Sequence, residues 1–152
     1  GFAARLGNIL SGTQVDPACM QLEVTESMIM DNVDEAVQIL NSIKELGVKV
    51  ALDDFGTGYS SLSMLTSLPL DKLKIDQSFV RKMIHDETSH AVTRAIIALG
   101  ETLKLTLVAE GIETEDALQY LHDTGCHQAQ GYLISRPLSA EAFARWWKQG
   151  LQ

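Results

Sequence analysis

The sequence predicts an α/β fold made of strand–helix units, and three observations support this prediction. Short apolar runs alternate with longer segments in which apolar residues recur at steps of three and four, the spacing of one helix face. The alternation occurs five times after an opening helix, which indicates parallel strands joined by helical crossovers. Polar residues stand at or near the C-terminal end of each run, where α/β barrels carry their functional groups.

The five expected strands are short, and they occupy residues 20–24, 48–52, 72–76, 105–109 and 129–133. A doubly wound sheet places its ligand site around one switch point, whereas a barrel collects functional groups from the ends of many strands. Because all five strands end near polar groups, the sequence favours the barrel.

The first two expected helices are amphipathic. One opens the chain over residues 2–10, and the next spans residues 33–46 with apolar side chains at steps of three and four. Asp31 or Asn32 can cap the start of this second helix, and Gly47 suits the position after its end.

The remaining helices are expected to begin and end at recognisable signals. One covers residues 92–103, and a shorter one over residues 60–65 stops before a proline. Another begins after Thr114, a suitable cap, and ends at Gly125. Ser139 opens the last helix. Its expected packing face consists of Phe143, Trp146 and Trp147.

The length of the chain bears on how much of a barrel it contains. A complete (β/α)8 barrel typically needs about 250 residues, whereas this chain has 152 and begins with Gly-Phe-Ala. We therefore expect residues 1–152 to form the C-terminal five strand–helix units of a TIM-like (β/α)8 barrel, incomplete in this chain. Strands left unpaired at the edges favour association with other chains, so a homodimer or higher oligomer is expected.

Composition narrows the class of partner. The chain is 45% hydrophobic and 21% charged, and its net charge is −8. This negative charge argues against binding to a nucleic-acid polymer, which relies on cationic side chains. No apolar run is long enough to span a bilayer and no targeting segment is visible, so a cytoplasmic location is expected, with membrane tethering of the parent protein through other segments left open.

The adjacent carboxylates Asp53 and Asp54 are the strongest local signal. They follow an expected buried strand and precede a glycine-containing loop. Two unpaired anions side by side repel each other, and a hard cation such as Mg²⁺ relieves that repulsion by binding carboxylate oxygens. The alternative is a helix-capping aspartate beside a solvated one. Carboxylates on other expected strand ends favour the metal.

Five motifs together resemble one known family. In chain order they are LEVTES (22–27), DDFGTGYSSL (53–62), LKID (73–76), AEGIET (109–114) and QGY (130–132). In order and spacing they are similar to those of the EAL-domain family, bacterial phosphodiesterases that hydrolyse cyclic di-GMP to linear pGpG. The resemblance covers essentially the whole chain. It implies a site that uses two divalent ions, Mg²⁺ or Mn²⁺.

The resemblance also implies roles for individual residues. Glu23 and Asp53 would bind the first metal ion and Asp54 the second. Lys74 would contact the attacking water and the phosphate, although a structural salt bridge to Asp53 or Asp76 is the alternative. Glu110 would be the general base.

Further residues gain roles from the same resemblance. Gln130 would support the water and metal site. Glu26 would hold the loop that couples dimerisation to metal and substrate binding. That loop consists of Phe55, Gly56, Thr57, Gly58, Tyr59, Ser60 and Ser61. A second group with neighbouring motifs would contact substrate, namely Glu113, Tyr132 and Pro137.

The chain departs from the family pattern because the signature Glu-Ala-Leu segment, which carries a metal ligand, is absent. The family residues expected within the segment present are retained, so the parent domain is expected to be active and this fragment alone inactive. The alternative is a catalytically inactive cyclic di-GMP receptor that acts through protein contacts. Upstream sensor or diguanylate-cyclase domains are compatible with either function.

Overall fold

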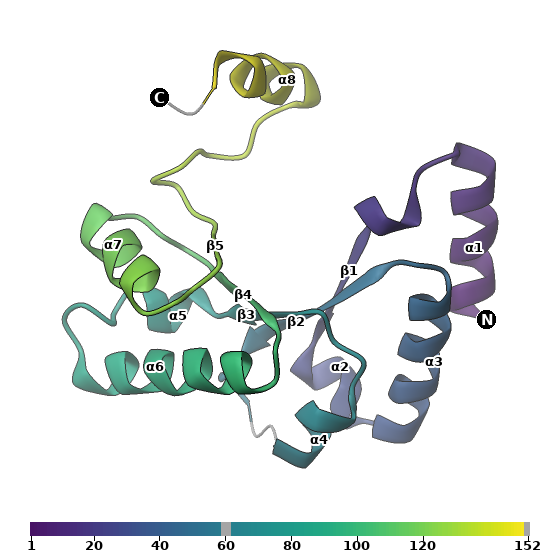
Figure 1. Cartoon of the computed structure of the whole chain (residues 1–152), viewed down its shortest axis with the longest axis horizontal. Coiled ribbons are helices and arrows are strands. Elements are labelled where there is room, and N and C mark those ends of the chain that lie inside the picture. Colours follow the sequence, from purple (N-terminus) through teal and green to yellow (C-terminus); the bar gives the residue numbers. More distant parts are fainter. Residues whose placement is uncertain (59–61, 151–152) are drawn as a thin grey trace.

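The computed structural model describes residues 1–58 and 62–150 as an α/β fold with one parallel sheet (Figure 1). The strands follow one another in chain order across the sheet, β1-β2-β3-β4-β5. Their bounds are β1 Gln21–Thr25, β2 Lys49–Phe55, β3 Lys72–Ile75, β4 Thr106–Ala109 and β5 Gln128–Ala129. In the described part of the chain β1 and β5 are the edge strands and do not pair with each other. The predicted parallel strand–helix order is confirmed, and the barrel is not closed in this chain.

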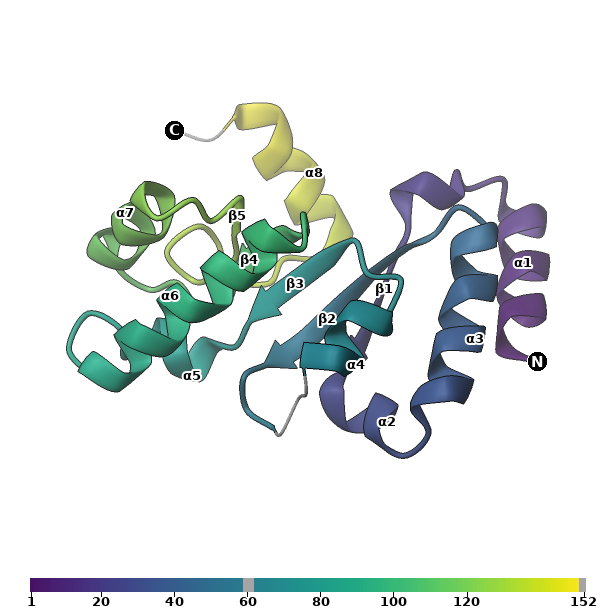
Figure 2. The ribbon, with the colours of Figure 1, turned by 60° about the horizontal axis from the view of Figure 1, so that its bottom comes forward.

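Helices connect the strands and lie outside the sheet (Figure 2). They are α1 Phe2–Thr13, α2 Glu26–Met30, α3 Val33–Glu45, α4 Leu62–Ser67, α5 Gln77–Val80, α6 Glu87–Thr102, α7 Glu115–Asp123 and α8 Ala140–Gln149, with a 3-10 turn at Pro17–Cys19. The predicted caps are confirmed: the side chains of Asn32, Thr114 and Ser139 accept hydrogen bonds from the first turns of α3, α7 and α8. No helix in the described ranges has the length and apolar character needed to cross a membrane.

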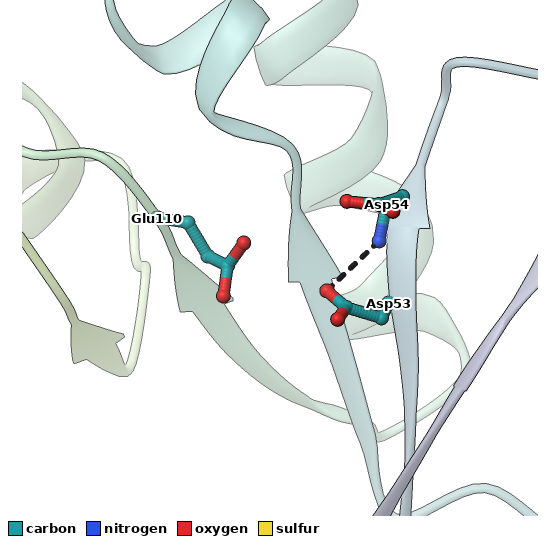
Figure 3. Close-up of side chains that lie close together, drawn as sticks. All are labelled: Asp53, Asp54 and Glu110. Atoms are coloured by element: carbon teal, nitrogen blue, oxygen red, sulfur yellow. Dashed lines mark hydrogen bonds between the residues drawn. The ribbon is translucent and has the colours of Figure 1, made fainter.

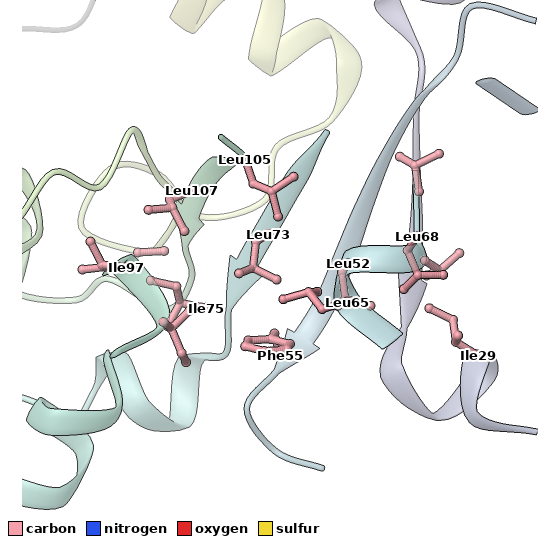
Figure 4. Packing of buried hydrophobic residues seen from close by; sticks show 14 of the residues in the cluster. Ile29, Leu52, Phe55, Leu65, Leu68, Leu73, Ile75, Ile97, Leu105 and Leu107 are labelled. Carbon is pink, nitrogen blue, oxygen red and sulfur yellow. The ribbon is translucent and has the colours of Figure 1, made fainter. Parts of the chain in front are cut away.

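The core lies between the sheet and its covering helices (Figure 4). Leu52, Leu73, Ile75 and Leu107 of the central strands are 0% exposed. In α6, a Cβ atom at Gly100 would lie 2.4 Å from Leu107, so the absent side chain lets this helix approach β4 closely. The filled core fixes the strands rigidly, which positions the groups at their C-terminal ends.

The structure differs from the expectation at two places near the C-terminus. The fifth strand is only Gln128–Ala129, because Gly131 begins a turn in which its carbonyl accepts the backbone N–H of Ile134. The expected packing face of α8 is also wrong for this chain. No residue of α8 is buried, and Phe143 and Trp147 remain 50% and 69% exposed, since no described element covers them.

The short helices α2 and α5 were not predicted. Each is a single turn or little more, too short for a hydrophobic period to show in the sequence. The expected short helix 60–65 is observed as Leu62–Ser67, and residues 60 and 61 lie outside the described part of the chain.

Candidate active site

Because the strands are parallel, the polar residues near their C-terminal ends all lie at the same end of the sheet. Thr25 of β1 pairs with Asp53 of β2, and Ile75 of β3 pairs with the residue before Glu110. The backbone N–H of Glu110 donates to the carbonyl of Ile75 at 3.2 Å, and that of Gln130 donates to Ala109 at 2.8 Å. Residues more than a hundred positions apart in the sequence therefore lie close together at the C-terminal ends of the strands.

The end of β2 departs from regular strand geometry. Asp54 adopts a left-handed backbone with φ 54°, and the pairing with β3 shifts register between Leu52 and Phe55. Neighbouring side chains of a regular strand point to opposite faces, but the left-handed residue redirects the second aspartate. Asp accepts this conformation more readily than most residues. Asp53 Oδ1 accepts the backbone N–H of Asp54 at 3.0 Å, which holds the pair in place (Figure 3).

Three carboxylates converge at the C-terminal ends of β2 and β4. Asp53, Asp54 and Glu110 each offer an oxygen, and these atoms lie within 4.8 Å of one another (Figure 3). Carboxylate oxygens in such a group are the ligands that Mg²⁺ and Mn²⁺ prefer. The donor set therefore fits the divalent ions that the resemblance implies.

Lys74 lies at the centre of the carboxylates and is only 5% exposed at its side chain. Its Nζ lies 2.7 Å from Glu23 Oε2, 2.7 Å from Glu110 Oε1 and 3.0 Å from Asp53 Oδ1. Four predicted site residues from four strand ends are thus in direct contact. The alternative salt bridge from Lys74 to Asp53 is present, but it is one contact among three.

The charges of this cluster perturb one another. Burial alone would lower the pKa of Lys74, but hydrogen bonds to Glu110, Glu23 and Asp53 outweigh it and raise that pKa. Burial raises the pKa of Glu110, and Lys74 only partly offsets this effect. Burial and the neighbouring charge of Asp53 raise the pKa of Asp54. The lysine therefore stays positive, while two carboxyls hold protons more strongly than usual.

Glu26 lies behind the loop that follows the aspartates. It is 5% exposed, and among the described residues neither of its carboxylate oxygens has a hydrogen-bond partner. A Cβ atom placed at Gly58 would lie 2.6 Å from Glu26 Oε1, so the loop backbone approaches this carboxylate directly. Gly56, Thr57 and Gly58 belong to the described part of that loop, whereas Phe55, predicted as a loop residue, is the buried last residue of β2 because it pairs with Ile75 of β3. Tyr59, Ser60 and Ser61 lie outside the described residues.

A hollow of about 210 Å³ adjoins the carboxylate cluster, and Glu110, Gln130, Glu113 and Tyr132 all line it. The structure thus brings three more predicted site residues, Gln130, Glu113 and Tyr132, next to Glu110. Pro137 is exposed and does not line this hollow.

Two polar residues of the region were missed as site residues. Arg81 lines the hollow and its guanidinium lies 2.8 Å from Glu113, yet α5 gave no periodic signal to place it there. Asp76 is buried, caps α5 through the N–H of Ser78, and contributes to the raised pKa of Asp54. An aspartate at a strand end, two residues before a serine, is a capping signal that could have located it.

Fold and site together define a parallel α/β-barrel segment with an acidic, lysine-centred site at its strand ends. The family model described as the EAL domain matches residues 1–137. The chain belongs to the EAL-domain family.

The known proteins similar to this chain agree with that assignment. This chain is 44% identical to the bifunctional diguanylate cyclase/cyclic di-GMP phosphodiesterase MucR of Pseudomonas aeruginosa over 141 residues, which are 93% of this chain. A solved MucR phosphodiesterase in complex with c-di-GMP has a TM-score of 0.87 at 45% identity, over 90% of this chain and 55% of that one. Klebsiella pneumoniae BlrP1, solved with manganese and cyclic di-GMP, has a TM-score of 0.81 at 36% identity, over 88% and 34% of the two chains. The chain spans only 17–21% of the length of the first curated relatives that it matches.

Proposed function

We propose that the domain to which this chain belongs hydrolyses cyclic di-GMP to linear pGpG. The contact of buried Lys74 with Glu23, Asp53 and Glu110, from the ends of four parallel strands, supports this function most strongly. The MucR and BlrP1 complexes with cyclic di-GMP support the choice of substrate.

We assign the metal-binding role to Glu23, Asp53 and Asp54 on the basis of the family resemblance. The group of converging carboxylates contains Asp53 and Asp54, with Glu110 as its third member and without Glu23. Two divalent ions, Mg²⁺ or Mn²⁺, would supply positive charge near the phosphate and activate water for attack. The raised pKa values of Asp54 and Glu110 agree with a group of anions that a cation would stabilise.

The protein's own side chains would carry the proton and charge steps. Because its pKa is raised, Glu110 is a stronger base than an ordinary carboxylate and is suited to accept the proton of the attacking water. Lys74 remains protonated and would stabilise negative charge that develops on the phosphate. Gln130, which lines the same hollow as Glu110, would orient the water through its amide.

The surrounding residues would couple loop and substrate to this chemistry. The approach of Gly58 to Glu26 supports a role for this carboxylate in holding the loop after the aspartates. Glu113 and Tyr132 line the hollow beside Glu110 and would contact substrate. Pro137 keeps the same proposed role from its motif alone.

The organisation of the full protein is also a proposal. We assign residues 1–152 to the C-terminal portion of one EAL domain, which on its own would lack part of the metal site and hydrolyse no cyclic di-GMP. Most of the length of the curated relatives lies outside the part that this chain matches. This supports additional sensor or diguanylate-cyclase domains in the full protein. A cytoplasmic site of action stays part of the proposal, and cell fractionation of the full protein tests it.

The assignment of Glu110 as the base can be tested by separating turnover from binding. In the intact domain, Glu110→Gln is expected to lower kcat about 10²–10⁴-fold, the usual contribution of general acid–base catalysis, while cyclic di-GMP still binds. Product formation by chromatography and ligand binding by calorimetry give the two readouts. Near-normal kcat would remove Glu110 from the chemistry.

A further inference from the structure

An ion pair between Arg81 and Glu113 lies in the wall of the hollow beside Glu110. Among the described residues that line this hollow of about 210 Å³, Arg81 alone carries a positive charge. Its guanidinium lies 2.8 Å from Glu113 Oε1, and the two side chains are 45% and 47% exposed. Both residues also line a smaller hollow of about 80 Å³. The pair is therefore part of the wall of both hollows.

The segment that carries Glu113 is held in place by its backbone. Ile112 is 0% exposed, its N–H donates to the carbonyl of Gln130 at 3.1 Å, and its carbonyl accepts the N–H of Leu133 at 3.0 Å. A Cβ atom at Gly131 would lie 2.1 Å from the Ile112 carbonyl oxygen, so the turn after β5 lies directly against this segment. The backbone of Glu113 thus has a fixed place, and its half-exposed side chain is the part left to orient.

Arg81 is held by the placement of the short helix α5. Its backbone N–H donates to the carbonyl of Gln77 at 3.0 Å, which closes the last turn of this helix. A Cβ atom at Gly111 would lie 2.5 Å from Gln77 Cβ and 3.4 Å from Arg81 Nε. The absent side chain at Gly111 therefore lets α5 bring the guanidinium next to Glu113.

The ion pair orients a side chain more than it stabilises the fold. A pair of half-exposed side chains contributes little to stability, because water screens the charges. An arginine guanidinium still fixes the direction of a carboxylate, since its N–H groups form a rigid planar fork. Glu113 also shares the hollow with the carboxylate of Glu110, and like charges repel. Without Arg81, the Glu113 carboxylate would be free to turn into solvent.

We propose that Arg81 is a positioning residue that holds the Glu113 carboxylate at the hollow, where it accepts a hydrogen bond from cyclic di-GMP. This inference rests on the proposed function and adds to it a residue that lies outside the five sequence motifs. A carboxylate repels phosphate and accepts from N–H or O–H groups, so Glu113 would contact a base or a ribose of the substrate. Loss of Arg81 should weaken substrate binding and leave the chemical step at Lys74 and Glu110 intact.

Steady-state kinetics of the intact domain test the proposal. Arg81→Gln removes the charge and is expected to raise KM for cyclic di-GMP about tenfold, the scale of one charge-assisted hydrogen bond, with kcat changed by less than about twofold. Arg81→Lys keeps the charge without the planar fork and should recover part of that loss. Lys82→Gln is the matched control, because it removes the same charge from the next residue, which does not line the hollow.

Direct binding and a double variant separate a positioning role from a structural one. Calorimetry in the Glu110→Gln background measures binding of cyclic di-GMP without turnover, and Arg81→Gln should weaken it by the factor that it adds to KM. Glu113→Ala should weaken binding at least as much. The double variant of Arg81→Gln with Glu113→Ala should bind no more weakly than Glu113→Ala alone, because Arg81 acts only through Glu113. Thermal melts check that each variant remains folded.

Several results would overturn the proposal. They are unchanged KM and binding for Arg81→Gln, a loss no greater than that of Lys82→Gln, and a fall in kcat alone. A further loss of binding in the double variant would show that Arg81 contacts the substrate itself. These outcomes leave the proposed hydrolysis intact, since the unmodified domain still turns over. If the domain binds cyclic di-GMP without hydrolysis, calorimetry still decides the role of Arg81, and a domain that does neither contradicts both proposals.

Discussion

The backbone of Asp54 shows how one residue shapes the acidic site. Its left-handed conformation directs a second carboxylate toward Asp53 and Glu110, at the cost of strain and repulsion. Lys74 offsets part of this repulsion through its three carboxylate contacts.

Replacing Asp54 with Asn tests the repulsion. The folded-state pKa of Asp54 lies above its ordinary value, so its contribution to stability is fully present below that ordinary value and is lost as pH rises through the folded-state pKa. Asp54→Asn, which keeps a residue tolerant of the left-handed backbone, should therefore raise the Tm of the chelator-treated chain near neutral pH. The gain should shrink toward pH ~4. Thermal melts at several pH values measure this, and a gain independent of pH would contradict it.

Lys74→Met removes the charge while retaining most of the apolar stem. In the intact domain it should lower kcat far more than it raises KM, because charge on the phosphate develops toward the transition state. In the metal-free protein it should also cost about 1–3 kcal/mol of stability, less than the ~3–5 for a fully buried pair, since the carboxylates keep some exposure. Steady-state kinetics and denaturant unfolding separate the effects. A large rise in KM at unchanged kcat would make Lys74 a ground-state phosphate contact.

Elements were predictable where sequence periodicity and capping signals agree. Val33–Glu45 and Glu115–Asp123 have both, and the structure confirms them. The single-turn helices α2 and α5 have no readable period, and the fifth strand is cut short by the turn at Gly131. Tertiary contacts determine the conformation of these segments, and local sequence propensity does not predict such contacts.

Two glycines in helices should respond in opposite ways to the same substitution. Gly100→Ala in α6 places a Cβ 2.4 Å from the buried side chain of Leu107 and should cost about 1–3 kcal/mol through overpacking. Gly12→Ala in α1 meets nothing within 4 Å and should stabilise by about 0.5 kcal/mol, because alanine favours helix. Urea unfolding measures both. Equal effects would show that helix propensity, and not the close approach of α6 to β4, governs Gly100.

At the scale of the whole molecule, the parallel order of the strands brings motifs that are distant in the sequence together in one site. Strand-end position and family resemblance predict Glu23, Asp53, Lys74 and Glu110 as one group, and in the structure the three carboxylates all contact Lys74. The salt bridge between Arg81 and Glu113 could not be foreseen, because it depends on how the short helix α5 lies against the segment after β4, where Gly111 approaches Gln77. The exposure of the aromatic face of α8 could not be foreseen either. The spacing of aromatic residues along a helix is the same whether or not another element covers that face.

Metal-dependent turnover by the intact domain is the most direct test of the central claim. With Mg²⁺ or Mn²⁺ present, we predict conversion of cyclic di-GMP to pGpG. Excess chelator should abolish it, re-added metal should restore it, and Asp53→Asn should remain nearly inactive in either state because a carboxylate ligand is lost. Chromatographic measurement of pGpG formation provides the readout. Undiminished pGpG formation in excess chelator, or full activity of Asp53→Asn, would contradict the account.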